Sequence, residues 1–340
     1  MTITYLVRSP GTGHSIEELF GTVQQEFDHQ PGIRTNRVYL PRISRGWWSV
    51  WLNLRFARTL KSDVFHITGD VHYTALALPG SRTVLTIHDC STLVTNQGRP
   101  FRYAFFWLFW YYFPIRRASV VTAVSDKTRQ ELINYVGRVA QKVIVVPNGY
   151  DPAFRHRPAL FQTSHPVLLQ VGTAPNKNLL RIITALEGIS CTLLLVGPLS
   201  GTIQQALQQR LIDYRQFENL SRAEVVQLYA DCDIVTFVST YEGFGMPLLE
   251  ANAVGRVVIT SINSPMYDQA PDSAHFVDPL DIEAIRQGIL RLITDAAYRQ
   301  KLVKAGLLNA QHHTAATAAF HYRSLYQKMV PIPPVAQPAR

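Results

Sequence analysis

A glycine-rich turn followed by a helix signal is the segment of this chain best suited to hold a ligand. Residues 241–251 read Tyr-Glu-Gly-Phe-Gly-Met-Pro-Leu-Leu-Glu-Ala and directly follow the apolar run Ile234–Val238, which predicts a buried strand. Gly243 and Gly245 permit a tight turn whose backbone can approach a ligand closely, and Pro247 suits the first position of a helix. The unbonded amides at the start of that helix favour phosphates or sugar hydroxyls.

Two glutamates bring negative charge to the same segment. Glu242 lies on the turn, from which it can reach a sugar or the charge that develops on one. Glu250 lies one helical turn beyond Pro247, ~5 Å along the axis. A carboxylate there can accept both hydroxyls of a ribose, as an acidic residue does in dinucleotide-binding folds. Taken alone, the two glutamates also fit a pair of solvated carboxylates, but their position after a buried strand favours a ligand site.

Two other strand ends carry polar residues. Lys177 begins a predicted helix after the strand Val167–Val171, and its charge adds to that of the helix N-terminus, which suits a diphosphate leaving group. His88 and Asp89 follow the strand Val84–Ile87. The imidazole can hydrogen-bond a sugar or its phosphate, or cap a turn, and Asp89 can orient the ring.

One pattern is set aside. Asp231 and Asp233 spell Asp-x-Asp, the metal-diphosphate motif of a different fold, but they join a predicted helix, Glu224–Ala230, to a predicted strand. We interpret them as a helix end and a strand entry, and predict no metal site.

The segment from Glu242 to Glu250 resembles the Glu-x7-Glu motif of the retaining family 4 glycosyltransferases. The resemblance extends over nearly the whole chain and is strongest over residues 165–295. It implies the GT-B fold, an α/β protein with two Rossmann-like doubly wound domains facing across a cleft that holds a nucleotide-sugar donor. As catalytic residues it implies Glu242, Lys177 and His88. As donor-binding residues it implies Gly11, Thr12, Gly13, Gly172, Thr173, Asn219, Leu220, Gly243, Phe244, Gly245, Met246, Pro247 and Glu250.

The resemblance also divides these residues by task. The loop Gly11–Gly13 lies where the family covers the donor phosphates, and Asn219-Leu220 lies where relatives hold the nucleotide base through backbone groups. Many members carry an arginine at the position of Thr173. The diphosphate contact is therefore expected to rest on Lys177 and a hydroxyl.

The reaction that the resemblance implies is transfer of a hexose, with retention of anomeric configuration, to a lipid-linked or polysaccharide acceptor. No cofactor and no metal is expected, and family habit favours UDP-glucose over GDP-mannose as the donor. Two alternatives stay open: a nucleotide-sugar epimerase of the same fold, and a non-catalytic nucleotide-sugar-binding protein. A dehydrogenase is disfavoured because no Gly-x-Gly-x-x-Gly follows a strand.

Alternating apolar runs and helical patterns must position these residues. Because the runs are apolar throughout, they indicate parallel sheets covered on both faces, with ligands beyond the carboxyl ends of the strands. We predict strands at Ile3–Val7, Val38–Leu40, Val64–Ile67, Val84–Ile87, Val120–Ala123, Val143–Val146, Val167–Val171, Thr192–Val196, Ile234–Val238, Val257–Thr260 and His275–Val277.

A loop-like break after Pro147 divides this alternation into two blocks. We expect an N-terminal acceptor-side domain over 1–155 and a C-terminal nucleotide-sugar-binding domain over 156–315. Residues 316–330 are predicted as a C-terminal helix, for which a return to the N-terminal domain is open, and 331–340 as a mobile tail.

Composition agrees with two folded domains. The chain has 340 residues, 47% of them hydrophobic and 17% charged, which excludes a disordered chain. The formal net charge is +9, and all of this excess lies in residues 1–160, where 19 Lys and Arg meet 10 Asp and Glu. An anionic partner is therefore expected for the N-terminal half.

All five tryptophans also lie in the N-terminal half, within two segments rich in arginine, 42–61 and 99–117. Arginines around aromatic helices predict docking on an anionic membrane surface, and the alternative is that the aromatics are core. No nucleic-acid-binding motif accompanies the charge, so no nucleic acid is expected. Three scattered cysteines, with neither a signal peptide nor a run of ~20 apolar residues, favour a cytoplasmic location, with peripheral attachment at the inner face of the membrane left open.

Overall fold

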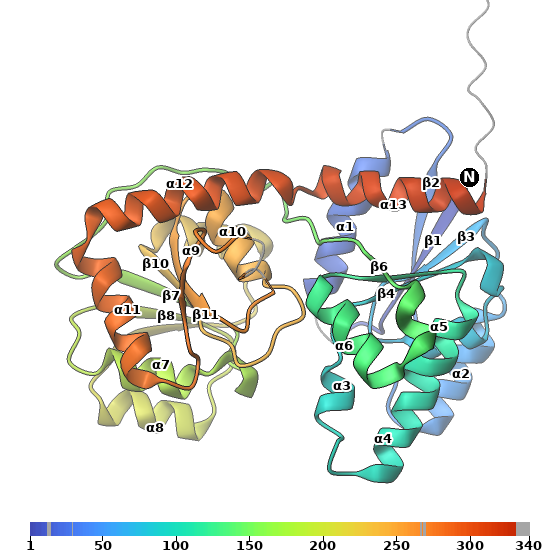
Figure 1. The fold of residues 1–340 in the computed structure, drawn as a ribbon, viewed down its shortest axis with the longest axis horizontal. Coiled ribbons are helices and arrows are strands. Elements are labelled where there is room, and N and C mark those ends of the chain that lie inside the picture. Colours follow the sequence, from blue (N-terminus) through green and yellow to red (C-terminus); the bar gives the residue numbers. More distant parts are fainter. Residues whose placement is uncertain (12–14, 29, 266, 268–269, 331–340) are drawn as a thin grey trace, which may run out of the picture. The chain divides into compact units, whose positions relative to one another are not determined.

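The computed structural model describes residues 1–11, 15–28, 30–265, 267 and 270–330, which form two compact units. Unit 1 comprises Met1–Gly149 together with the C-terminal segment from Ala315, and unit 2 comprises Tyr150–Thr314. Each unit contains one six-stranded parallel sheet with helices on both faces (Figure 1). The tail predicted at residues 331–340 lies outside the described residues.

The sheet of unit 1 has the strand order β2-β1-β3-β4-β5-β6. Its strands are β1 (Thr2–Val7), β2 (Arg34–Tyr39), β3 (Val64–Ile67), β4 (Thr83–Ile87), β5 (Val120–Ala123) and β6 (Ile144–Val145). Its helices are α1 (Ser15–Asp28), α2 (Trp47–Ala57), α3 (Ser91–Val94), α4 (Pro100–Phe106), α5 (Phe113–Arg117), α6 (Asp126–Val136) and α13 (Ala315–Met329), with the short helices η1 (His72–Leu76), η2 (Gly80–Arg82), η3 (Trp107–Tyr112) and η4 (Arg138–Lys142).

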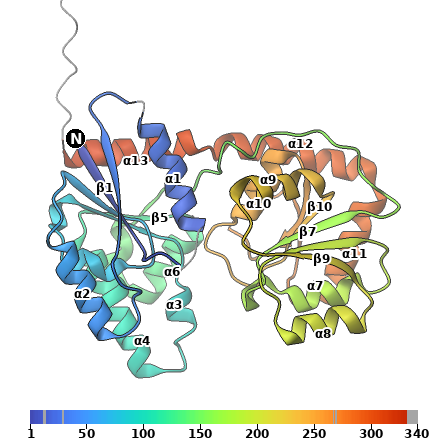
Figure 2. The ribbon, with the colours of Figure 1, turned by 180° about the vertical axis from the view of Figure 1, so that it is seen from behind.

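Successive side chains of these strands point to opposite faces of the sheet, as the two-residue period of a strand requires. Leu6 of β1 and Phe65 of β3 belong to a core that also includes Trp110 of η3. Their neighbours Tyr5 and His66 face the opposite side, where α1 and α13 pack side by side (Figures 1 and 2).

His66 fastens α13 to this sheet. Its Nδ1 lies 2.6 Å from the hydroxyl of Tyr326 on α13, and its Nε2 lies 2.7 Å from Oγ1 of Thr86 on β4. Burial lowers the pKa of His66 to about 3. The ring is therefore neutral in the folded unit at neutral pH, with one nitrogen donating and the other accepting.

The aromatic run of the sequence forms one continuous helical segment made of α4, the π-helix η3 and α5. Pro114 has no N–H, so the carbonyl of Trp110 four residues before it needs another donor. His72 Nδ1 lies 3.0 Å from that carbonyl oxygen and supplies the donor. Among the described residues, no helix combines the length and apolar character needed to cross a membrane.

The sheet of unit 2 has the strand order β12-β11-β10-β7-β8-β9. Its strands are β7 (Val167–Val171), β8 (Thr192–Val196), β9 (Asp213–Phe217), β10 (Ile234–Phe237), β11 (Val257–Ser261) and β12 (His275–Val277). Its helices are η5 (Pro175–Lys177), α7 (Leu179–Leu186), α8 (Gly201–Gln209), α9 (Arg222–Asp231), α10 (Met246–Val254), α11 (Ile282–Thr294) and α12 (Ala296–His312). Helices α7, α8 and α11 cover one face, while α9 and α10 lie on the other with α12 packed along α10 (Figure 1).

The strand predictions are accurate for several central strands, whereas the edge strands are mixed: β12 is predicted with its correct bounds, but β2 and β9 are not. The bounds predicted for β3, β5, β7, β8 and β12 are confirmed. Strand β9 was not predicted, and the prediction for β2, at Val38–Leu40, lies too late in the chain. Both are edge strands with alternating exposed residues, so neither carries the continuous apolar run that marks a strand buried on both faces.

Candidate functional site

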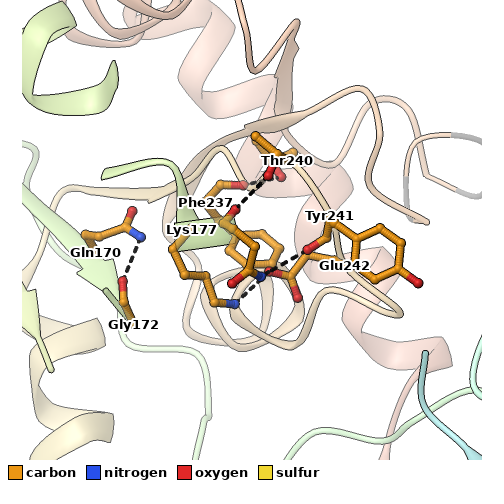
Figure 3. A network of polar contacts seen from close by, with 9 residues as sticks. Gln170, Gly172, Lys177, Phe237, Thr240, Tyr241 and Glu242 are labelled. Atoms are coloured by element: carbon orange, nitrogen blue, oxygen red, sulfur yellow. Dashed lines mark hydrogen bonds and ion pairs between the residues drawn. The ribbon is translucent and has the colours of Figure 1, made fainter. Parts of the chain in front are cut away.

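The carboxyl edge of the sheet in unit 2 brings two of the predicted catalytic residues into contact. Lys177 ends η5, which follows β7, and Glu242 lies on the turn after β10, the strand next to β7. The Nζ of Lys177 lies 2.7 Å from Oε1 of Glu242 (Figure 3). The two side chains are 19% and 18% exposed, so the ion pair is partly withdrawn from water yet accessible.

Asn176 fixes the distance between these two loops. Its Nδ2 donates to the carbonyl of Tyr241 at 3.1 Å, and its own carbonyl accepts from the amide of Thr240 at 2.8 Å. The ammonium of Lys177 also lies 5.0 Å from the ring centre of Phe237 (Figure 3). No role was predicted for Asn176, although it lies next to Lys177 in the same loop.

Gly172 has a backbone that only glycine adopts easily at this position. Its φ is +89°, and a Cβ added there would lie 3.2 Å from Cε of Lys177. Thr173, which follows it, donates its hydroxyl proton to the carbonyl of Pro198 at 2.6 Å. To contact a diphosphate as predicted, the hydroxyl of Thr173 would have to give up its hydrogen bond to Pro198 and donate to the phosphate instead.

The glycine-rich turn ends in α10 as expected, with one difference. The helix begins at Met246, so Pro247 is its second residue rather than its first. Gly245, at φ +120°, precedes the helix, and Gly243 and Phe244 complete the turn after Glu242. The amides in the first turn of α10 therefore lie at the same carboxyl edge of the sheet as Glu242.

Glu250 is buried among partners of its own unit. Its Oε2 accepts from the hydroxyl of Tyr229 at 2.7 Å, and its Oε1 lies 3.3 Å from NH2 of Arg222. Burial and the neighbouring carboxylate raise the pKa of Tyr229 well above its usual range, so the hydroxyl keeps its proton. A carboxylate offers about four lone pairs in all, so such a group can accept more than two hydrogen bonds.

Arg222 and Tyr229 are residues that the sequence analysis missed. Arg222 also pairs with Asp151 at 3.0 Å and lies 4.4 Å over the ring of Phe154, so it links α9 to the segment that begins unit 2. The sequence contained a signal for the start of this helix, because Ser221 and Glu224 have the spacing of a capping box and form one at the beginning of α9. Residues 222 and 229 are seven apart and so lie on one face of that helix.

The segment predicted to hold a nucleotide base also lies at this edge. Asn219, with a left-handed φ of +54°, and Leu220 follow β9. In the strand order β9 is two positions from β7, which corresponds to ~10 Å at the usual strand spacing.

The remaining predicted residues belong to unit 1. His88 follows β4, and its Nε2 lies 2.8 Å from the carbonyl oxygen of Thr68, so this nitrogen carries the proton. Burial lowers the pKa of His88. The orientation of the ring expected from Asp89 comes instead from this carbonyl, because Asp89 accepts from the amide and hydroxyl of Ser91 at the start of α3. Gly11 has a φ of +82°, while Thr12 and Gly13 lie outside the described residues.

The Asp-x-Asp pattern is divided between two tasks, as interpreted from the sequence. Asp233 accepts from the backbone amides of Gln162 and Val167 at 3.0 and 2.8 Å, and Asp231 accepts from Gln227 within α9. Within the described part of the chain, no three His, Cys, Asp or Glu side chains are grouped as a metal site requires.

Two doubly wound parallel sheets with polar groups at their carboxyl edges define a protein of two Rossmann-like units. The sequence model of the family described as Glycosyltransferase Family 4 matches residues 4–154, and that of Glycosyl transferases group 1 matches residues 153–308. This chain belongs to the family 4 glycosyltransferases, as the resemblance indicated.

Curated relatives agree with this assignment. The O-antigen chain mannosyltransferase B of Escherichia coli is 25% identical over 256 residues, which are 68% of this chain and 66% of the relative. The serotype-specific mannosyltransferase WbdA of Escherichia coli is 23% identical over 227 residues, which are 60% of this chain and 28% of the relative. The match thus spans just under two thirds of the first relative and just over a quarter of the second.

A solved structure shows the same fold. Anabaena HepE in complex with UDP and glucose matches with a TM-score of 0.75 at 19% identity, over 96% of this chain and 100% of that one. The predicted GT-B class, with two Rossmann-like domains, is confirmed.

Proposed function

We propose that this chain is a retaining hexosyltransferase that moves a hexose from a nucleotide diphosphate sugar to a lipid-linked or polysaccharide acceptor in polysaccharide biosynthesis. The observation that carries the proposal is the contact between Lys177 and Glu242, beside the first turn of α10. A cation, a carboxylate and helix-end amides at one strand edge suit a diphosphate and the sugar attached to it.

In the proposed reaction, the bond between the anomeric carbon and the diphosphate oxygen breaks, and the leaving diphosphate takes the electron pair. Lys177 and the amides of α10 stabilise this developing negative charge, and each such preorganised donor lowers the barrier by ~3–4 kcal/mol. Glu242 stabilises positive charge on the sugar. The acceptor hydroxyl attacks the same face of the sugar, and its proton passes to the leaving phosphate oxygen. Glu250 holds the ribose.

The proposal includes no metal ion, because Lys177 and the start of α10 supply the positive charge. For the donor, the sequence analysis favours UDP-glucose, and the UDP and glucose bound by Anabaena HepE support it. The two Escherichia coli relatives are named as mannosyltransferases, which supports mannose as the transferred hexose.

A panel of UDP-, GDP- and ADP-sugars, incubated with the purified chain with and without EDTA, tests the proposal. We expect one donor to raise the melting temperature and to release its nucleotide diphosphate in EDTA, with an α-linked product from an α-linked donor. Conversion of the donor to another nucleotide sugar would instead identify an epimerase. Binding without turnover in the presence of any acceptor would identify a binding protein.

The surface of unit 1 supports a membrane-bound acceptor. Trp47, Trp48 and Trp51 on α2 are 77%, 54% and 42% exposed, and Trp48 stacks on Trp51. Helix α4 lies next to α2 in both views (Figures 1 and 2), and the segment from α4 to α5 carries further exposed aromatic side chains. The exposed aromatic face comprises Trp47, Trp48, Trp51, Phe101, Phe105, Phe109 and Phe113.

The interpretation as core applies to only part of these aromatics. Trp110 and Tyr111 are buried in the core of unit 1, whereas the exposed aromatic face is open to solvent. Exposed arginines flank these aromatics in the sequence: Arg42, Arg45, Arg55, Arg58, Arg99, Arg102 and Arg116. Of these, Arg55 lies 5.7 Å from the ring centre of Trp51. We propose that the face rests on the anionic inner surface of a membrane, with the rings at headgroup depth.

A further inference from the structure

Unit 2 contains a cavity of about 640 Å³ that none of the predicted site residues lines. Its floor is formed where β10 and β11 begin, by Asp233 and Val257 among others, and its sides by the segment 156–161 and by α12. Lys177 and Glu242 follow the opposite, carboxyl ends of strands in the same sheet. Strands of four or five residues separate the two edges, ~15 Å at the usual rise, so this cavity is distinct from the candidate donor site.

The walls of the cavity are mainly apolar. Leu160 and Leu308 are 90% and 52% exposed, so the apolar surface continues out to the rim. The apolar side chains that line it include Leu160, Phe161, Val257, Val303, Leu307 and Leu308. An alkyl chain would remove this surface from water, which is favourable in proportion to the area covered.

The charged side chains that line the cavity are predominantly positive. Arg256, Arg299 and Lys304 contribute three cations. The carboxylate of Asp233 is already bonded to the backbone amides of Gln162 and Val167. The lining therefore favours an anion over a cation or a neutral head group.

Arg256 is the most deeply buried of these three cations. Its side chain is buried, with only 5% of the residue exposed, and its terminal nitrogens donate to the carbonyls of Arg157 and Ala230. Its Nε is buried without a hydrogen-bond partner within the described residues. This atom has almost no surface accessible to water, so a head group in the cavity would interact with Arg256 through its charge rather than through a bond to Nε.

We propose that this cavity binds a single-chain anionic amphiphile, with its alkyl chain along the apolar wall and its head group near Arg256 and Lys304. The volume lies within the ~300–1,000 Å³ of ordinary ligand pockets. This second site does not depend on the glycosyl transfer proposed above.

Calorimetry on the full chain with dodecyl phosphate, below its micelle concentration, tests the proposal, with laurate as a second anionic head group. We expect saturable 1:1 binding of at least one of them, with dodecanol and inorganic phosphate each binding at least tenfold more weakly. Lys304→Glu and Leu308→Glu alter exposed rim residues and should each weaken binding at least fivefold. Lys301→Glu is the matched control, because Lys301 lies on the same helix but does not line the cavity, and it should bind like the unaltered chain.

Several outcomes would overturn the proposal. Equal binding of inorganic phosphate would show an anion site without a role for the alkyl chain. Equal binding of dodecanol would show an apolar cavity without a role for the cations. Unchanged binding by both rim variants would locate the amphiphile elsewhere, for example on the exposed aromatic face of unit 1. Lys177→Ala should leave amphiphile binding intact, which separates this test from that of the donor site.

Discussion

The ammonium of Lys177 lies 2.7 Å from the carboxylate of Glu242, although 65 residues separate them in the sequence. They meet because β7 and β10 are hydrogen-bonded neighbours and both residues follow the carboxyl ends of these strands. Asn176 then ties the two loops together through the backbone of Thr240 and Tyr241. The pair holds opposite charges at the place where we propose that the diphosphate sugar binds.

Removing either charge of this pair should abolish most of the transfer. We expect Lys177→Ala and Glu242→Gln each to reduce kcat/KM for the identified donor at least a hundredfold, which corresponds to about 3 kcal/mol in the barrier. Steady-state kinetics and a thermal melt of each variant measure the effect. Lys301→Ala removes an exposed ion pair with Asp272, at 2.9 Å, and should retain full activity. Near-normal transfer by both site variants would refute their assignment.

Gly172 offers a test of how tightly the site positions Lys177. In Gly172→Ala the new methyl group meets the lysine side chain and also strains a backbone with φ +89°. Gly188→Ala carries comparable strain at φ +74° but meets no atom within 4 Å. We expect both variants to lose about 1 kcal/mol of stability, but only Gly172→Ala to lose transfer, by at least tenfold. Equal activity in the two variants would mean that the position of Lys177 is not critical.

The stability of unit 1 should fall in acid because of His66. The pKa of this buried histidine is about 3 in the folded chain and about 6.5 when unfolded, so the unfolded state binds the proton first. The free energy of unfolding therefore decreases as pH falls from about 6.5 towards 3, by ~2 kcal/mol at pH 5 from this residue. His72, with a pKa lowered to about 4, acts in the same direction.

Urea unfolding followed by tryptophan fluorescence at pH 7.5 and 5.0 measures this effect on unit 1, since all five tryptophans lie there. His66→Gln should be less stable at pH 7.5, because its bonds to Tyr326 and Thr86 are altered, and should lose less stability between the two pH values. An unchanged pH dependence in the variant would assign the acid sensitivity to other groups.

The exposed aromatic face should bind anionic vesicles through both its rings and its charges. In flotation with vesicles containing phosphatidylglycerol, we expect the unaltered chain to float and the combined variant Trp47→Ala/Trp48→Ala/Trp51→Ala to remain largely at the bottom. Reversal of Arg45, Arg55 and Arg58 to Glu should do the same, since each basic residue near the surface contributes about 1 kcal/mol. Leu211→Ala alters an equally prominent exposed side chain of unit 2 and is the control. If the aromatic and arginine variants float like the unaltered chain, unit 1 does not dock through this face.

Local sequence determined the elements that are buried and the turns that end them. A strand buried on both faces must be apolar throughout, so β3, β5, β7 and β8 are visible in the sequence with their correct bounds. The turn from Glu242 to Pro247 is equally visible, because glycine and proline restrict the backbone locally. The edge strands β2 and β9 are less visible, because water covers part of them and permits polar residues.

Only the tertiary structure decided which of these strands and turns, and which of their side chains, lie next to one another. The neighbour of β10 is β7 rather than the preceding strand β9, and this crossover places Lys177 against Glu242. The same packing surrounds Glu250 with Tyr229 and Arg222, directs the hydroxyl of Thr173 to Pro198, and leaves Trp47 exposed while it buries Trp110. Residue type sets what a side chain can do, but its partners lie far away in the chain, and their proximity follows from strand order and burial rather than from any local preference.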